Sequence, residues 1–269
     1  MTIASPSPLL ALDRITVRFG GLVALNEVTM AVPPGTVVGV IGPNGAGKTT
    51  LFNVICGFVR PQEGSLHWRG EQLRSHSPRE LAGLGIARTL QGLGLFAGLS
   101  VLENVMAGAQ RHARAKGFAT IFGTRKAAHD EAALTDRAMH VLRELGVDQH
   151  AKVIPRMLPY GVQKRVALAR ALVAEPAMLL LDEPASGLSA AEIDELAGRI
   201  RRFTETTSVV VVEHHMDLVM RVCDHIVVLN FGELIAEGTP AEVRADPLVT
   251  EAYLGADTDT ADVSGARRA

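Results

Sequence analysis

The sequence has few cysteines, no excess of basic residues and no long apolar run. Its 27 lysines and arginines face 29 aspartates and glutamates in 269 residues, which gives a formal net charge of −2. This balance excludes a strongly basic nucleic-acid binder held by phosphate neutralisation alone. The two cysteines, Cys56 and Cys223, lie far apart in apolar helical patterns, which argues against a disulfide framework and a cysteine-type zinc site.

Membrane-spanning and targeting segments are also missing. The longest apolar stretches, such as 178–181 and 209–212, are far shorter than the ~18 residues of a membrane span. Residues 1–8 lack the basic region and apolar core of a signal peptide. We therefore expect a reduced, intracellular protein with at most a peripheral membrane role. With 47% apolar and 21% charged residues, the chain can bury a large core.

Turn signals and alternating residues predict several hairpins. The pattern from Leu10 to Val32, interrupted by a turn at 19–21, predicts an antiparallel sheet at the N-terminus. Further hairpins are predicted at 65–73 and 226–236, each with a glycine in its turn. The last stretch, 256–269, has almost no large apolar side chain and is expected to be a disordered tail.

Continuous apolar runs predict a second, parallel sheet. The runs at 37–41, 178–181 and 209–212 do not alternate, which is typical of strands buried on both faces. A helix pattern from Lys48 to about Phe58 follows the first run. Between about residues 95 and 165 the segments become alanine-rich and amphipathic, as at 101–109 and 132–145. We expect a helical insert within an α/β core.

A glycine-rich turn between the first buried strand and its helix fits the pattern G-x-x-x-x-G-K-[ST]. Gly45 and Gly47 can take positive φ, so that backbone N–H groups converge on phosphate oxygens, whereas Pro43 has no N–H to offer. Lys48 is expected to reach the β- and γ-phosphates, and the Thr49 hydroxyl to bind Mg²⁺. The candidate nucleotide-binding residues of this turn are Gly42, Pro43, Asn44, Gly45, Ala46, Gly47, Lys48, Thr49 and Thr50.

Two carboxylates, Asp182 and Glu183, stand at the carboxyl end of the run at 178–181, where open α/β sheets bind ligands. Asp182 is expected to hold Mg²⁺, since a hard cation prefers oxygen ligands. Glu183 is expected to orient and deprotonate the attacking water. Solvation of the strand end, or a helix N-cap, is the simpler alternative for two adjacent acids.

These motifs, in this order, resemble the ATP-binding subunits of ABC transporters up to about Gly255. The resemblance implies a P-loop NTPase core with a RecA-like parallel sheet, an N-terminal antiparallel β subdomain and an inserted α-helical subdomain. The ATPase domain is expected at residues 9–255, with the core at 9–91 and 166–255 and the helical insert at 92–165. ATP as substrate and Mg²⁺ are implied.

The resemblance assigns roles to further residues. Phe19 matches the aromatic residue that stacks on adenine, Gln91 the glutamine that touches the metal and the attacking water, and His214 the histidine that senses the γ-phosphate. His215 takes the place where relatives often have aspartate. Because adjacent strand residues face opposite sides, a metal site made of both histidines is not expected.

Residues 158–163 stand where the family has its signature sequence, and two positions depart from it. Pro159 replaces the serine, and Val162 replaces the glutamine. The resemblance implies that Tyr160 and Gly161 approach the nucleotide of the opposite subunit. Pro159 offers no hydroxyl, but the N–H groups from Gly161 onward are still expected at a helix N-terminus. Ser189 likewise stands where aspartate or asparagine is common in the dimer-contact loop.

Motifs at 19–22, 95–105, 213–216 and 236–240 look most like those of importers of branched-chain amino acids. Such a subunit implies a second ATP-binding subunit, identical or related, together with transmembrane permease subunits and an extracytoplasmic solute-binding protein. It implies a peripheral position at the cytoplasmic face of the cell membrane, and no nucleic acid partner. Two alternatives remain open: a nucleotide-binding regulator with low turnover, suggested by Pro159 and Val162, and a non-transport ABC ATPase.

Overall fold

The computed structural model describes residues 7–89, 92–109 and 125–253. The chain divides into two compact units, to which we refer as unit 1 (residues 1–79 and 200–269) and unit 2 (residues 80–199). Within the described ranges, no helix combines the length and the apolar character needed to cross a membrane.

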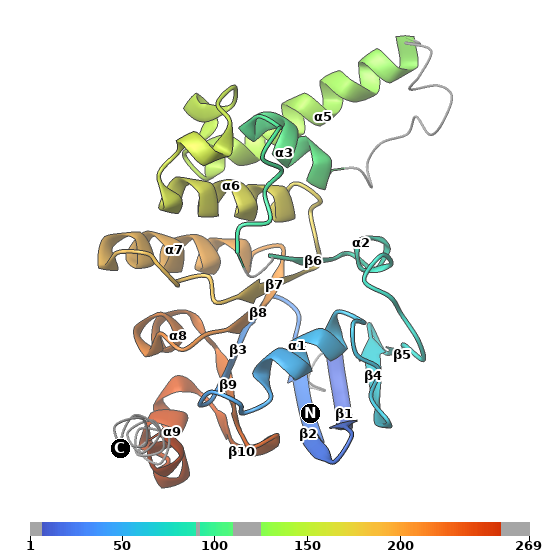
Figure 1. The fold of residues 1–269 in the computed structure, drawn as a ribbon, viewed down its shortest axis with the longest axis vertical. Coiled ribbons are helices and arrows are strands. Elements are labelled where there is room, and N and C mark those ends of the chain that lie inside the picture. The colour runs from blue at the N-terminus through green and yellow to red at the C-terminus, as the bar shows by residue number, and fades with distance from the viewer. Residues whose placement is uncertain (1–6, 90–91, 110–124, 254–269) are drawn as a thin grey trace, which may run out of the picture. The chain divides into compact units, whose positions relative to one another are not determined.

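The antiparallel sheet of unit 1 has the strand order β2-β1-β4-β5 (Figure 1). A two-residue turn joins β1 (Leu10–Phe19) to β2 (Leu22–Val32), and β1 also pairs with β4 (Glu63–Trp68), which turns back into β5 (Glu71–Gln72). Leu10, Leu12 and Ile15 of β1 are buried, so one face of this sheet belongs to the core. The predicted N-terminal hairpins are thereby confirmed.

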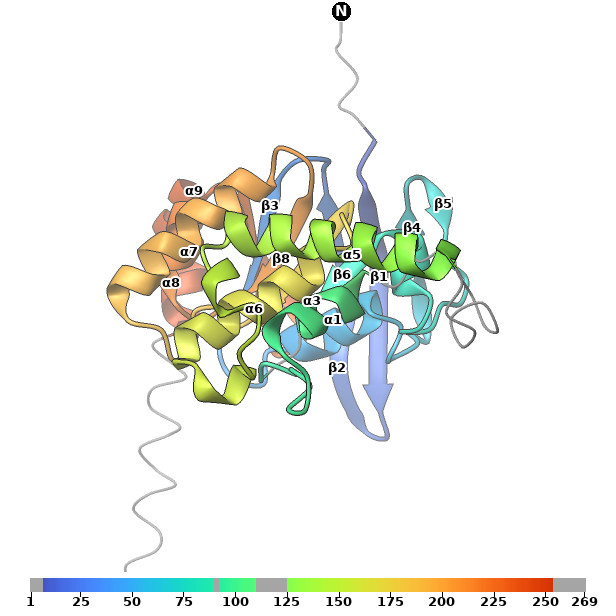
Figure 2. The same ribbon diagram turned by 90° about the horizontal axis from the view of Figure 1, so that it is seen from above.

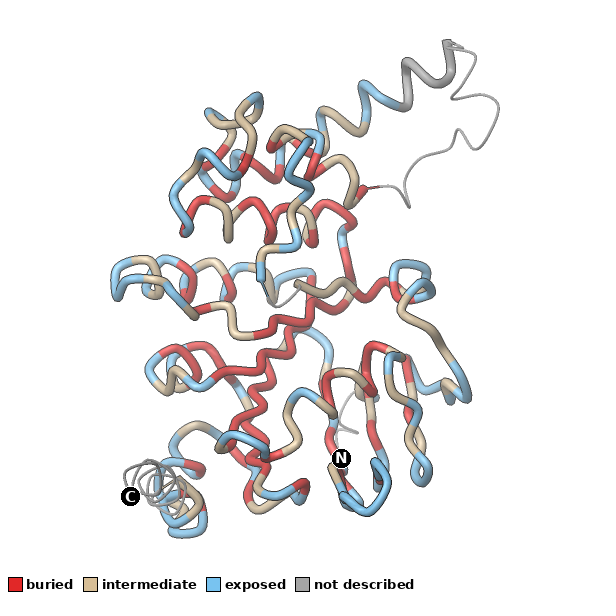
Figure 3. Tube along the Cα trace, in the orientation of Figure 1, coloured by how far each residue is buried: buried red, intermediate tan, exposed pale blue. Residues whose placement is uncertain are grey.

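Four further strands of unit 1 follow the order β10-β9-β3-β8. β3 (Val37–Ile41) pairs in parallel with β8 (Ser208–Val212) and β9 (His225–Asn230), and β10 (Glu233–Gly238) returns antiparallel to β9. Every residue of β3 and β8 is buried (Figure 3). This burial on both faces explains why their sequences do not alternate. Both strands end at the same edge of the sheet.

Short helices connect these strands. α1 (Lys48–Ile55) follows β3, α8 (Met216–Val222) follows β8, and α9 (Pro240–Ala245) follows β10. Gly39 of β3 leaves room for the residue after α8, because a Cβ atom at position 39 would lie 2.7 Å from the Sγ atom of Cys223. α1 is shorter than predicted: Cys56 caps it, and Gly57 takes a φ of 73°.

Unit 2 contains one pair of parallel strands and most of the long helices (Figures 1 and 2). β6 (Ile86–Arg88) pairs with β7 (Met178–Asp182), and α2 (Leu81–Leu84) precedes β6. α3 (Val101–Gly108), α5 (Arg125–Glu144) and α6 (Tyr160–Leu172) pack on one another. Two 3₁₀ turns, Asp148–His150 and Pro155–Met157, lead into α6, and α7 (Ala190–Phe203) follows β7.

The observed elements confirm the predicted α/β class, its antiparallel and parallel strands and its group of amphipathic helices. The close approach of α3 to α6 has a local cause, since a Cβ atom at Gly108 would lie 2.0 Å from the carbonyl oxygen of Arg170. The predicted boundaries of the core and the insert stay a prediction, and the predicted tail at 256–269 lies outside the described residues.

Candidate functional site

The glycine-rich turn lies between β3 and α1, as predicted. Gly42, Gly45 and Gly47 have φ values of 149°, 81° and 100°, all unfavourable for residues with a Cβ atom. A Cβ atom at Gly42 would lie 2.1 Å from the carbonyl oxygen of Leu229, and one at Gly47 would lie 2.7 Å from that of Ala24. Gly45 has open space around it. The turn is therefore packed against the sheet at both ends and open in its middle.

Lys48 begins α1 and folds back over the turn. Its Nζ atom donates hydrogen bonds to the carbonyl oxygens of Gly42 at 2.7 Å and Pro43 at 2.8 Å. The helix has no side-chain N-cap and no acidic residue in its first turn, so its N–H groups and positive dipole end suit an anion. Asn44, Gly45 and Thr49 are exposed, whereas Ala46 is buried. The loop, which we call the cradle, thus holds one ammonium group on two backbone carbonyls next to the N–H groups that begin α1.

Phe19 ends β1 beside the turn that leads to β2. Its side chain is 52% exposed, so its ring is accessible for stacking on a flat ligand. The β2 strand of the same hairpin contacts the cradle, because the Ala24 carbonyl lies against Gly47. The aromatic residue and the cradle therefore belong to one unit.

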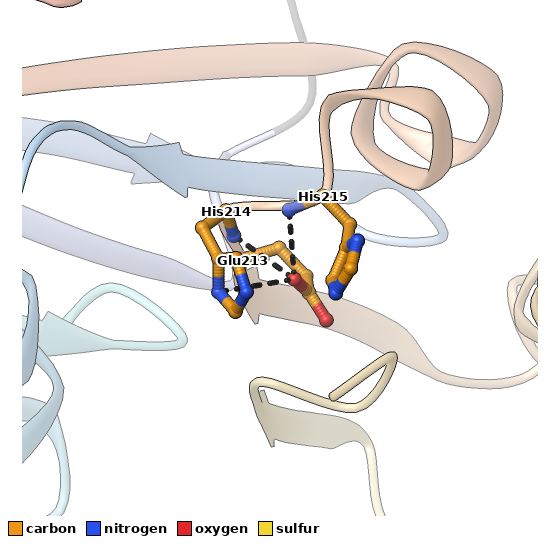
Figure 4. Close-up of side chains that lie close together, drawn as sticks. All are labelled: Glu213, His214 and His215. Carbon is orange, nitrogen blue, oxygen red and sulfur yellow. Dashed lines mark hydrogen bonds and ion pairs between the residues drawn. The ribbon is translucent and has the colours of Figure 1, made fainter. Parts of the chain in front are cut away.

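Glu213, His214 and His215 follow β8 at the sheet edge where the cradle begins (Figure 4). The Oε2 atom of Glu213, which is fully buried, accepts hydrogen bonds from the backbone N–H groups of His214 at 2.9 Å and His215 at 3.1 Å. The side chain of His214 is 53% exposed. Fixed backbone and an exposed imidazole suit His214 to contact a ligand in the cradle.

The expectation that His214 and His215 point apart is wrong. Their ring centroids are 4.5 Å apart. His215 is the N-cap of α8 and no longer part of the strand, so strand alternation does not apply to it. One ligand-type atom from each of Glu213, His214 and His215 lies within 4.8 Å of the others.

Asp182 is the last residue of β7 in unit 2 and Glu183 follows it, so both lie at the strand end, as predicted. The Oδ2 atom of Asp182 accepts a hydrogen bond from Nη2 of Arg88 at 3.0 Å, and both side chains are mostly buried. In the parallel pairing of β6 with β7, Arg88 lies opposite Leu180, two residues before Asp182, and its side chain reaches the carboxylate. Glu183 is half-buried and has a φ of 47°, a left-handed conformation that is rare for a residue with a side chain. Strain of this kind often accompanies function.

The departures from the signature sequence lie at the N-terminus of α6. Pro159 is the N-cap and offers no side-chain hydrogen bond, although its φ of −53° suits the start of a helix. Tyr160 is 44% exposed, whereas Gly161 is buried. A Cβ atom at Gly161 would lie 1.9 Å from Oε1 of Glu192. A side chain at this position would displace the Glu192 carboxylate, so glycine lets α6 and the capping residue of α7 approach each other closely.

Glu192 places a negative charge beside this helix tip. Its Oε2 atom accepts hydrogen bonds from the backbone N–H of Ser189 at 2.9 Å and from the Ser189 hydroxyl at 2.8 Å. These hydrogen bonds lower the pKa of Glu192, so the carboxylate stays ionised at neutral pH. Ser189 therefore has a structural role as a helix cap.

Sequence reasoning missed Lys164. Its Nζ atom donates hydrogen bonds to the carbonyl oxygens of Pro184 at 2.8 Å and Glu183 at 3.3 Å. The same residue, with Tyr160, Gly161, Asp182 and Glu183, lines an open pocket of about 110 Å³ in unit 2. Its spacing of four residues from Tyr160 was the available signal, because such residues share a helix face.

The structure thus brings together the cradle, Phe19 and His214 in unit 1, and Asp182, Glu183, Tyr160 and Gly161 in unit 2. Gln91 lies outside the described residues. The functional roles assigned to these residues stay predictions, although the local geometry of each motif agrees with them.

The chain belongs to the ABC transporter family, whose sequence model matches residues 25–186. The family explains why a phosphate cradle, a helix tip and an acidic strand end occur in this order along the chain. A second model, that of the branched-chain amino acid ATP-binding cassette transporter, matches residues 233–259. The expected membership of the superfamily and the P-loop NTPase fold are thereby confirmed.

Individual relatives cover nearly the whole chain. The high-affinity branched-chain amino acid transport ATP-binding protein BraF of Pseudomonas aeruginosa is 39% identical over 250 residues, which are 92% of this chain and 98% of that protein. The protein LivG of Escherichia coli, which has the same description, is 38% identical over 251 residues, with 92% and 98% covered.

Solved structures of ATP-binding cassettes share the fold. The ADP conformation of the cassette MJ1267 has a TM-score of 0.79 and 30% identity, and covers 92% of this chain and 99% of that one. A dimeric, post-hydrolysis state of the cassette MJ0796, bound to ADP and Pi, has a TM-score of 0.72 and 25% identity, with 86% and 98% covered.

Proposed function

We propose that this chain is the ATP-hydrolysing subunit of a membrane importer for branched-chain amino acids or a related small solute. The observation that carries the proposal is the cradle, in which three glycines with positive φ and Lys48 stand at the start of α1. The match of both family models, and relatives described as branched-chain amino acid transport proteins, support the substrate class.

The triphosphate binds to the cradle. The Lys48 ammonium lies on two backbone carbonyls at the mouth of the turn, and phosphate oxygens replace these acceptors when ATP binds. The exposed N–H groups near Gly45 surround the β-phosphate, and the exposed ring of Phe19 stacks on the base. His214 donates a hydrogen bond toward the γ-phosphate from the neighbouring strand end.

Each of the two units provides an oxygen donor of the type that Mg²⁺ prefers. The Thr49 hydroxyl is exposed at the first turn of α1, and Asp182 contributes a carboxylate held by Arg88. Gln91, by resemblance, completes the set. Mg²⁺ neutralises phosphate charge when bound. Because Arg88 already holds the Asp182 carboxylate in place, binding of Mg²⁺ would cost little side-chain entropy at this residue.

Glu183 acts as the general base. Its carboxylate accepts a proton from the water whose oxygen attacks the γ-phosphorus, and the bond to the ADP oxygen breaks. Glu183 lies directly after a buried strand, and its carbonyl oxygen accepts a hydrogen bond from Lys164, so the backbone that carries the carboxylate is held in place. A carboxylate on a fixed backbone can orient the attacking water in line with the γ-phosphate.

Turnover requires a second ATP-binding subunit. The Tyr160–Gly161 tip of one chain contacts the nucleotide in the cradle of the other, and the dimeric relative bound to ADP and Pi supports this arrangement. The pair is identical or related, docks on permease subunits at the cytoplasmic face of the cell membrane, and works with an extracytoplasmic solute-binding protein. ATP closes the pair and hydrolysis opens it, and the conformation of the permease is coupled to these two states. Residues 93–103 are proposed to contact the permease.

Phosphate release tests this function. We expect the purified chain to hydrolyse ATP when assembled with its co-purified membrane subunits, and Glu183→Gln to reduce that turnover to a slow residual rate that single-turnover experiments can measure. Uptake of labelled leucine into proteoliposomes that contain the assembled complex and its solute receptor then tests the substrate class. No phosphate release, either alone or in the complex, contradicts the proposal and favours the regulator.

A further inference from the structure

The main chain of Glu183 adopts a conformation that needs support. Its φ of 47° lies in the left-handed region, where a Cβ atom is unfavourable. The next residue, Pro184, has no N–H group and cannot anchor the turn by donating a hydrogen bond. One stabilising contact is local, since the Ser186 N–H donates to the Glu183 carbonyl at 3.2 Å.

A second contact comes from a different element. Lys164 of α6 donates from Nζ to the carbonyl oxygens of Pro184 and Glu183, at 2.8 and 3.3 Å. The side chain is half-buried, which limits competition from water. Two carbonyl dipoles directed at one ammonium group favour the observed path of the chain over one in which Glu183 relaxes to negative φ.

The same ammonium group also contacts the tip of α6. Its Nζ atom lies 5.4 Å from the centroid of the Tyr160 ring, within the range of a cation–π interaction. The Tyr160 ring in turn covers the loop after Glu183, because a Cβ atom at Gly187 would lie 2.9 Å from the ring. Tyrosine at 160, lysine at 164 and glycine at 187 thus form one packed arrangement around the carbonyl of Glu183.

We propose that Lys164 is a positioning residue that holds Glu183 in its hydrolytic geometry and links it to the tip of α6. The inference rests on the proposed function. The tip of α6 contacts the nucleotide of the opposite subunit. Binding of that nucleotide therefore affects the position of Tyr160 and, through Lys164, the position of Glu183, the general base of the same chain. The two hydrolytic sites of the pair are coupled through this lysine.

Substitutions at Lys164 separate positioning from a merely structural role. Lys164→Met removes the ammonium group and retains an unbranched apolar stem. We expect its kcat to fall roughly tenfold to a hundredfold, the effect of losing hydrogen bonds to a charged group, with KM for ATP unchanged. Lys164→Arg is expected to recover most of the turnover, because guanidinium can donate to both carbonyls. Lys152→Met, at an exposed lysine of the same unit, is the matched control and should behave as the parent.

A double-mutant cycle tests whether Lys164 acts through Glu183. In single-turnover experiments on the assembled complex, adding Lys164→Met to Glu183→Gln should cause no further loss, because the carboxylate to be positioned is already gone. ATP-induced dimerisation of the double variant should persist. Equal losses in both backgrounds, a rise of KM with unchanged kcat, or normal turnover in Lys164→Met would each overturn the proposal. Lys164→Gln, which keeps a polar donor, provides the same comparison if Lys164→Met does not fold.

The outcomes keep this inference distinct from the proposed function. Failure of the function appears as unchanged turnover in Glu183→Gln, or as no turnover in the parent complex. If the inference alone fails, Glu183→Gln shows its expected loss of turnover, whereas Lys164→Met turns over ATP at the rate of the parent.

Discussion

Replacing Gly42 and Gly45 by alanine, one at a time, tests the construction of the cradle. Both glycines have positive φ, so both substitutions carry a backbone cost of about 1–2 kcal/mol. Only Gly42 also lacks space, since its Cβ atom would lie 2.1 Å from the Leu229 carbonyl oxygen and 3.0 Å from the Ala46 Cβ atom. Relieving this overlap requires a backbone shift in β9 or in the turn, at a further cost of about 1–3 kcal/mol.

We therefore expect Gly42→Ala to lower the free energy of unfolding by about 2–5 kcal/mol and Gly45→Ala by only about 1–2 kcal/mol. Urea unfolding of the nucleotide-free chain measures both values. The only tryptophan, Trp68, is buried in β4 of the same unit, and its fluorescence reports the transition. Equal losses in the two variants, or a larger loss for Gly45→Ala, would refute the reasoning from packing at Gly42.

Three further predictions concern binding, turnover and pH. Lys48→Ala is expected to weaken ATP binding at least tenfold, and an unchanged affinity in an equilibrium titration would contradict the cradle assignment. Pro159→Ser is expected to leave hydrolysis by the assembled complex unchanged, because partner amides replace the missing hydroxyl, whereas a large gain would show that nothing compensates. Burial raises the pKa of the Cys223 thiol from 9.0 to about 12, so its contribution to stability is complete below pH 9 and is lost as pH rises toward 12. Melting temperatures between pH 8 and 11 should accordingly fall more steeply for the parent than for Cys223→Ala, and parallel slopes would contradict this.

Features determined by neighbouring residues could be predicted from the sequence. The cradle is one, because its glycines, lysine and flanking strand and helix are contiguous from Val37 to Ile55. The hairpin at Asn230 is another, since Phe231 and Gly232 take the positive φ that its tight turn requires. Asp182 and Glu183 could be placed at a strand end for the same reason.

Features determined by distant contacts could not be predicted. α1 ends earlier than its pattern suggests because Nε2 of His76 contacts the carbonyl oxygen of Ile55 at 2.9 Å, and because Gly57 lies against the His76 backbone. The contact of Lys164 with Glu183 joins residues 19 positions apart on different elements. The close approach of the His214 and His215 rings depends on where β8 ends, and an error of one residue reverses the expected direction of a side chain.

A structure of the Glu183→Gln variant with ATP and Mg²⁺ tests the central claim most directly. The account predicts two chains facing each other, with each triphosphate wrapped by the Gly42–Thr50 backbone of one chain and capped by the Tyr160–Gly161 helix tip of the other. A closed dimer in which these tips point away from both nucleotides, or in which ATP binds outside the cradle, would contradict it.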